Sequence, residues 1–454
     1  MRMEYDDVAW EQSDKVFDRF KKKKVTKPHV LLAVTNFMAG YRPESRPVDR
    51  ARVEGMGAFN LCYRIIFEDG FSSLLRFPCP GRVMFSEEKV RNEVAVMTFL
   101  RQNTKIPVPT IIHYGMGDES PAGLGPFILM EYVKHACHLM AQLRTPGYKR
   151  GERPFLNPDI EEEKLEFFYG QVADILLELS KPSFGKIGSL ARDVNGDWGI
   201  NHRPWTMNMN ELAQLGNYPP KLLPQSAFTT ASSYYQSLAK TECMHLTTQR
   251  NDAFDSEDDC RFKYVARKLF QKLAEESSLH NSSAPESGPF KLFSAVIDWE
   301  FTYAAPVEFI HSPPWWLLLD MPEEWPRGIS NWKKTYQPRL ETFLRVLKRQ
   351  EDAAIAAGSL LEGQRLSGKM RESWDRGDFW INHGVRKSWA FDSVWPMMDA
   401  KFFGGDTALE QRDSLLCSDE RTELLDDEDK EAIEHFIRKK LEDSKKRILD
   451  DWDD

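Results

Sequence analysis

The sequence has 454 residues, enough for two or three packed units rather than one small core. Hydrophobic residues make up 41% and charged residues 29%, which is ordinary for a globular protein, and the formal net charge is −9. This acidic balance argues against a general nucleic-acid binder, because such a protein needs a basic face to neutralise phosphates. The longest aromatic and aliphatic cluster, residues 315–319, is too short to span a bilayer, so we expect neither a nucleic-acid nor a membrane partner.

The cysteines and the N-terminus favour a cytoplasmic location. The six cysteines are scattered and form no Cys-x-x-Cys pair, which is typical of reduced thiols rather than of disulfides or a zinc site. Residues 1–10 carry acids and no apolar stretch, so they do not resemble a secretory signal. A basic tetrad at residues 21–24 is explained more simply by a solvated helix face than by a nuclear signal.

Residues 1–47 are expected to form a helical extension, and residues 48–134 a small lobe that contains a mixed β-sheet. The pattern predicts, in order, a strand over 59–67, a turn at 68–70, a strand over 74–77, a helix over 87–102 and a buried strand over 127–133. The helix is indicated by apolar residues at helical spacing, among them Val90, Val94 and Met97. This order of strands and helix is that of a small mixed lobe.

After residue 134 the pattern becomes mainly helical. Apolar spacing predicts helices over 161–179, 261–274, 332–348 and 429–446, with an exposed loop over 275–288. We therefore expect a helical core over 135–320 and a C-terminal helical extension with an acidic tail over 321–454. The pattern therefore predicts an α+β fold class with two lobes, a small one with a sheet and a larger, mainly helical one.

Two glycines, Gly55 and Gly57, stand just before the first predicted strand. Glycines one residue apart let a backbone approach a ligand closely, so that N–H groups can face phosphate oxygens. An ordinary turn explains the same residues more simply. The pair is therefore a candidate phosphate-binding turn and not a motif that identifies one.

A strand arginine and a helix glutamate form the second candidate. Arg76 lies in a predicted strand and Glu93 in the helix that follows it. In protein kinases a strand lysine pairs with a helix glutamate and holds the α- and β-phosphates, and arginine is a permanently charged group that can also grip phosphate. The alternative is an ion pair that only joins two elements.

The last strand of the small lobe runs toward a connection between lobes. Residues 127–133 are apolar or aromatic except for Glu131, and the run ends at Val133. A hinge at this point would offer backbone groups to an adenine ring, so both residues are candidate nucleotide contacts. A simple core strand explains the apolar run as well, and the two interpretations are compatible.

The most specific candidate for a functional residue is Asp298, which follows the apolar pair Val296 and Ile297. Apolar residues directly before an aspartate place its carboxylate at the end of a buried strand. A Mg²⁺ ion that bridges nucleotide phosphates needs such a hard oxygen ligand. Asp298 is therefore the candidate metal ligand.

In combination these segments resemble the aminoglycoside phosphotransferase family, in the large branch found in filamentous fungi. The likeness is carried by residues 55–60, 75–78, 92–94, 106–109 and 125–132, and in the helical part by 188–190, 297–301 and 312–316. It implies a kinase-like fold and, for active members, ATP- and Mg²⁺-dependent phosphoryl transfer to a hydroxyl of a small molecule. The acceptor cannot be named, because relatives act on aminoglycosides, choline, homoserine, sugars and other hydroxyl compounds.

One part of the family pattern is missing. Active members carry a loop of the type His-x-Asp-x-x-x-x-Asn, whose Asp takes or orients the proton of the acceptor hydroxyl. The loop and the hairpin after it need roughly 15–20 residues. Here only Ser294 and Ala295 separate Phe293, where the loop would begin, from Val296. The sequence thus predicts that the loop is absent, and no catalytic residue is assigned.

The missing loop leaves two interpretations open. The chain is either a noncatalytic, pseudokinase-like module that binds nucleotide or protein, or the product of a gene model or splicing event that dropped a coding segment. In the C-terminal part, Glu323 and Glu324 could attract a cationic acceptor, but a solvated surface position explains them more simply. The lone histidines His311 and His383 are expected to be packing or surface residues.

Overall fold

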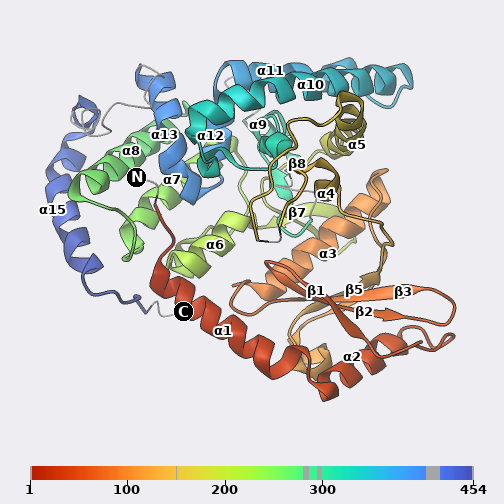
Figure 1. The fold of residues 1–454 in the computed structure, drawn as a ribbon. Coiled ribbons are helices and arrows are strands. Elements are labelled where there is room, and N and C mark those ends of the chain that lie inside the picture. The colour runs from red at the N-terminus through yellow and green to blue at the C-terminus, as the bar shows by residue number, and fades with distance from the viewer. Residues whose placement is uncertain (1–2, 150, 280–285, 294–298, 405–419, 452–454) are drawn as a thin grey trace.

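The smaller lobe is a five-stranded sheet with helices on both faces (Figure 1). The computed structural model describes residues 3–149, 151–279, 286–293, 299–404 and 420–451. The strands are β1 (Arg52–Met56), β2 (Asn60–Ile66), β3 (Ser72–Pro78), β4 (Ile111–Gly115) and β5 (Phe127–Glu131), in the order β1-β2-β3-β5-β4. Every neighbouring pair is antiparallel, so the sheet is antiparallel throughout rather than mixed.

Alternation of side chains along the strands explains how the two faces of the sheet are covered. On one face Leu61 and Leu129 pack with Val34 of α2 (Pro28–Gly40). On the other face Ile128 and Val94 of α3 (Ser86–Asn103) share a second apolar cluster. Strand β5 is therefore buried on both sides, which is why its sequence is a continuous apolar run.

The turn between β2 and β3 requires its glycine. Residues Ile66 and Ser72 are the last paired positions of the two strands, and Gly70 within the turn has a φ of +83°. Glycine reaches this left-handed region without a Cβ clash, whereas other residues are strained there. The turn predicted at residues 68–70 is confirmed.

The larger lobe is mainly helical. Its longer helices are α5 (Glu162–Ser180), α6 (Met207–Leu215), α7 (Ala231–Thr248), α8 (Glu257–Glu275), α10 (Gly328–Ala356), α11 (Ser367–Asp375), α13 (Ser388–Phe403) and α15 (Asp427–Ser444), and α4 (Leu139–Leu143), α9 (Val307–Ile310) and α12 (Asp378–Gly384) are short. Two small hairpins, β6 (Ser189–Arg192) with β7 (Trp198–His202) and β8 (Lys291–Phe293) with β9 (Tyr303–Ala305), lie among them. Aromatic contacts join distant helices, as where Tyr169 of α5 meets the edge of Phe343 of α10 at a centroid distance of 5.5 Å.

The fold class predicted from the sequence, an α+β two-lobed kinase-like arrangement, is confirmed. The helices predicted over 161–179, 261–274 and 429–446 correspond closely to α5, α8 and α15, and the one predicted over 332–348 is the middle of the longer α10. The strand predicted over 127–133 ends earlier, at Glu131, because the chain leaves the sheet there and Val133 is 55% exposed. Strands β1 and β4 were not predicted.

The N-terminal helices connect the two lobes. Helix α1 (Asp7–Phe20) starts against α6 of the larger lobe and leads through η1 (Lys21–Val25) to α2 on the sheet (Figure 1). The lysines of the basic tetrad lie in η1, and Lys24 Nζ donates a hydrogen bond to the carbonyl of Gly123, 2.6 Å away. The basic tetrad thus flanks the sheet, on the solvated helical segment that was expected.

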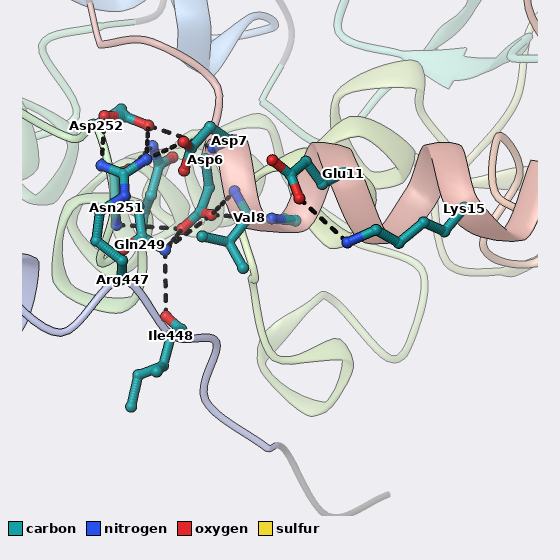
Figure 2. Close-up of polar contacts among 11 residues, drawn as sticks. Asp6, Asp7, Val8, Glu11, Lys15, Gln249, Asn251, Asp252, Arg447 and Ile448 are labelled. Carbon is teal, nitrogen blue, oxygen red and sulfur yellow. Dashed lines mark hydrogen bonds and ion pairs between the residues drawn. The ribbon is translucent and has the colours of Figure 1, made fainter.

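The chain ends of the larger lobe meet at the start of α1 (Figure 2). Asp6 is fully buried and caps α1 by accepting a hydrogen bond from Ala9 N, 3.0 Å away. Its carboxylate also accepts from Asn251 Nδ2 at 2.9 Å, and the same amide donates to the carbonyl of Ile448 at 3.2 Å.

Among the described residues, no helix combines the length and the apolar character needed to cross a membrane.

Candidate functional site

An ion pair joins the sheet to α3 where the sequence placed the second candidate. The guanidinium of Arg76, on β3, contacts the carboxylate of Glu93 on α3. The Glu93 side chain is only 1% exposed, while that of Arg76 is 15% exposed. The predicted strand-to-helix couple therefore exists.

The pair belongs to a larger buried network that the sequence did not suggest. Lys89, one turn before Glu93 on α3, lies 3.3 Å from Glu93 and 2.5 Å from Glu300. Its ammonium also donates to Asn60 Oδ1 at 2.9 Å, and Asn60 Nδ2 donates to Glu300 at 2.9 Å. Among the described residues of this cluster, two cations thus face two carboxylates, the pairing that buried ions require.

The network joins both lobes. Asn60 begins β2, Lys89 lies on α3, and Glu300 comes two residues after Asp298 in the larger lobe. A signal for Lys89 was present, because it stands four residues before Glu93 and such residues face each other on a helix. Its burial was not visible in the sequence, since charged helix residues are usually solvated.

The first glycine lies in line with Arg76 across the sheet. Gly55 pairs with Cys62 on β2, and Cys62 pairs with Arg76 on β3, so the three form one row. Two strand spacings separate Gly55 from Arg76, roughly 10 Å. Gly55 is therefore part of a strand and not of a turn, which corrects one of the interpretations of these glycines.

The second glycine opens the turn between β1 and β2. Gly57 N donates to the carbonyl of Asn60 at 2.9 Å, which closes a tight turn over Ala58 and Phe59. Among the atoms of the described residues, a Cβ placed on Gly57 would meet nothing nearer than this carbonyl oxygen at 4.0 Å, and one on Gly55 would meet nothing within 4 Å. Packing against this described part of the chain therefore explains neither glycine.

The tip of this turn touches the larger lobe. The ring of Phe59 meets that of Phe301 edge to face, with centroids 5.3 Å apart. Phe301 also packs with Trp205, just before α6. The glycine turn is thus held directly above the segment that follows Asp298.

The hinge candidates lie at the end of β5, apart from the ion pair. Glu131 pairs with Ser73 on β3, three residues before Arg76. Its carboxylate accepts from Thr110 Oγ1 at 3.0 Å, and its N–H donates to the carbonyl of Thr110 at 2.9 Å. The carbonyl of Val133 is 2.9 Å from His135 Nδ1, so both residues have partners on the exposed side of the connection.

The predicted metal ligand, Asp298, falls outside the described residues, as does all of 294–298. Strands β8 and β9 pair on either side of that segment, with Phe293 opposite Tyr303. The connection between the strands is therefore residues 294–302, nine in all. Among the described residues, no three His, Cys, Asp or Glu side chains are grouped to hold a metal ion, and the nearby Glu300 is bonded to Lys89 and Asn60.

A small pocket of about 60 Å³ adjoins Phe301 within the larger lobe. Its wall includes Glu211 from α6, Trp315 from η5 (Trp315–Leu318) and Lys387 before α13. Burial raises the pKa of Glu211 to about 7, with Lys387 opposing the shift. The pocket thus combines acidic, basic and aromatic groups beside the segment that follows Asp298.

Glu323 and His383, beside this pocket, are both buried and paired with each other. The side chain of Glu323 is 5% exposed, not solvated, and accepts from His383 Nε2 at 2.8 Å. Burial would raise the pKa of Glu323, but Lys387 and His383 lower it by more. The His383 side chain is itself buried, so it is a packing residue as expected, although with an acidic partner. For the other lone histidine, His311, burial lowers the pKa to about 3.

Comparison with known proteins gives similarities without a family assignment. No family model matches the chain. A curated protein named Altered inheritance of mitochondria protein 9, mitochondrial, from Lodderomyces elongisporus, is 28% identical over 154 residues, which is 33% of this chain and 22% of that protein. The match therefore spans about a fifth of the relative's length.

The solved structures to which this chain is similar include a phosphotransferase and a kinase. A macrolide 2'-phosphotransferase type I is 11% identical over 89% of this chain and 99% of that one, with a TM-score of 0.40. Plasmodium vivax ethanolamine kinase is 10% identical over 90% of this chain and 92% of its own, with a TM-score of 0.38.

Proposed function

We propose that this chain is a kinase-like protein of the aminoglycoside phosphotransferase type that binds ATP with Mg²⁺ between its lobes. The observation that carries the proposal is the ion pair between Arg76 of β3 and Glu93 of α3. Kinases use a pair in this position to hold the α- and β-phosphates. Gly55 in the same row of the sheet, and Gly57 at the turn, would bring backbone close to the phosphates.

The remaining ligand contacts follow from the same proposal. Asp298 would hold the Mg²⁺ ion, which neutralises charge on the phosphates. Glu131 and Val133 would stand beside the adenine ring at the hinge. The acceptor would be a hydroxyl of a small molecule. We propose the cytoplasm as the compartment of the protein. The curated relative's name places that protein in mitochondria, so imaging of a tagged chain should compare the two locations.

We further propose that phosphotransferase turnover is negligible. Nine residues connect β8 to β9, too few for a His-x-Asp-x-x-x-x-Asn loop and its hairpin. Loss of a positioned base costs about 10²–10⁴ in rate. The alternative explanation for the short connection is a coding segment that was dropped from a longer message. The transcript across the codons of Phe293 and Ser294 distinguishes this explanation from a true pseudokinase.

A second candidate is a noncatalytic module that binds a protein partner. The curated relative's name describes mitochondrial inheritance and not a reaction, which is why this candidate is kept. In such a module the network of Lys89, Glu93 and Glu300 would only join the lobes. Nucleotide binding separates the two candidates.

Thermal unfolding of the full chain tests the proposal. Mg·ATP at 100 times its Kd should stabilise the protein by about 2.7 kcal/mol. Arg76→Met should abolish the shift because it removes the phosphate-facing cation, whereas Arg76→Lys should keep most of it. Arg91→Met is the matched control, since Arg91 lies on α3 but pairs with exposed Glu87 at 2.9 Å.

The outcomes are distinct. No shift in the wild-type chain would reject ATP binding and leave the protein-binding candidate. The same preparations should consume no ATP beyond a buffer blank. Turnover that Asp298→Ala abolishes would contradict the proposed inactivity while supporting the metal ligand.

A further inference from the structure

The pocket that Phe301 lines adjoins the segment that follows Asp298. Phe301 is three residues after Asp298, and its ring contacts Phe59 at the tip of the glycine turn. Glu211 of α6 and Trp315 also line the pocket. A molecule in this pocket would therefore be next to phosphates held under the turn, so the inference rests on the proposed function.

The chemistry of the wall is mixed. The carboxylate of Glu211 accepts no hydrogen bond from the residues that the structure describes, and the side chain is half-buried. Arg386 and Lys387 line the pocket as cations. A hydroxyl can donate to a carboxylate and accept from an ammonium or guanidinium, so a molecule with several hydroxyls matches both kinds of group.

Lys387 occupies the position that a cationic ligand would need. Its ammonium lies 5.4 Å from the centroid of the Trp315 ring and 3.4 Å from Glu323. An aromatic face beside a carboxylate is a usual site for an ammonium ligand. Here the chain's own ammonium fills that site, and Lys387 lowers the pKa of both neighbouring carboxyl groups, Glu211 and Glu323.

Size sets a further limit. The cavity of about 60 Å³ corresponds to roughly four to six water positions, at 10–15 Å³ each. That is room for a molecule of a few carbon atoms, or for one end of a longer one. The aromatic walls, Phe301 and Trp315, suit its carbon skeleton.

We propose that this pocket binds a small, neutral, polyhydroxylated molecule through Glu211 and Lys387, and that Lys387 excludes acceptors that carry an ammonium group. Glu211 selects ligands that can donate a hydroxyl hydrogen bond. Lys387 selects neutral ligands over those that carry a positive charge. Both act on binding, so their effects can be measured without turnover.

Ligand-observed NMR on the full chain tests this with four probes: glycerol and erythritol as neutral polyols, and choline and ethanolamine as ammonium compounds. Saturation transfer should reach the polyols and be absent or much weaker for the ammonium probes. Glu211→Ala should weaken polyol binding about tenfold, the usual effect of losing a charge-assisted hydrogen bond, and Glu211→Gln should weaken it less. Lys387→Met should admit choline and ethanolamine.

Lys333→Met is the matched control, because Lys333 is exposed on α10, and it should change nothing. Stronger transfer to choline than to the polyols in the wild-type chain would overturn the proposal. So would unchanged probe binding in both Glu211→Ala and Lys387→Met, provided that each variant unfolds cooperatively.

The two proposals fail separately. A Mg·ATP shift without polyol binding rejects only the pocket assignment. Polyol binding without a Mg·ATP shift rejects ATP binding and keeps the pocket.

Discussion

Single residues of this protein show how burial changes a charged group. Glu242, on α7, has no solvent exposure, and its Oε1 accepts from Ser388 Oγ at 2.6 Å. Burial raises the pKa of Glu242 to about 7 from an ordinary 4.5, although Arg267 and the Ser388 hydroxyl lower it. The folded protein therefore holds this proton to higher pH than the unfolded chain does.

The sign of the pH effect follows directly. Between pH 4.5 and 7 the unfolded chain binds fewer protons at this position, so the free energy of unfolding falls as pH rises. Glu242→Gln removes this titration. We expect the variant to gain stability relative to wild type across that window, by on the order of 3 kcal/mol above pH 7.

Urea denaturation at pH 5 and pH 8 measures this difference. Glu163→Gln, at an exposed position of α5, is the control and should give equal differences at both pH values. A Glu242→Gln variant whose stability relative to wild type does not rise with pH would contradict the raised pKa.

At the scale of elements, the start of α1 is fixed by contacts that lie far away in the sequence. Asp6 caps the helix through Ala9 N and is also bonded to Asn251, in the loop between α7 and α8 (Figure 2). Arg447 holds the same region by pairing with Asp7 and with Asp252. The cap is therefore both a local and a tertiary interaction.

Removing Asp6 should cost more than an ordinary cap. Asp6→Ala loses the cap and leaves the buried Asn251 amide without this acceptor, so we expect a loss of about 2–3 kcal/mol in the free energy of unfolding. Glu11→Ala on the same helix is the control, because Glu11 pairs with Lys15 at the surface and both side chains are 69% exposed. Chemical denaturation of both variants should show the difference, and equal losses would mean that the burial of Asp6 adds nothing.

Elements that bury one clear stripe were predicted well. Helix α3 was expected over 87–102 and runs from Ser86 to Asn103, because its apolar spacing is regular. Strand β4 was not expected, since its residues are only partly buried at the edge of the sheet. Edge strands take their stability from one neighbour, so their sequences carry a weaker pattern.

At the scale of the whole molecule, the network of Lys89, Asn60 and Glu300 connects the lobes. Glu300 comes from the larger lobe, and its partners come from β2 and α3 of the smaller lobe. A buried charge that loses its partner is costly, because neither water nor another ion replaces it. The relative position of the lobes should therefore depend on this one carboxylate.

Glu300→Ala should lower the free energy of unfolding by about 3 kcal/mol, because Lys89 stays buried without its closest partner. The control is Glu87→Ala, which breaks the exposed pair with Arg91 on the same helix and should cost less than about 1 kcal/mol. Denaturation curves of both variants check this expectation. Equal costs would show that the interlobe network does not stabilise the fold.

The sequence by itself predicted the α+β class, most of the long helices and the candidate couple of Arg76 with Glu93, because apolar periodicity and turn residues act locally. From the two residues between Phe293 and Val296 it also predicted that the family's catalytic loop is absent, and this stays a prediction. Only the tertiary structure decided that Lys89 and Glu300 are buried together, that Glu323 pairs with His383, and that Lys387 lies over Trp315. Each of these depends on which distant segments meet, and whether a charged side chain is solvated or paired is set by that meeting and not by its neighbours along the chain.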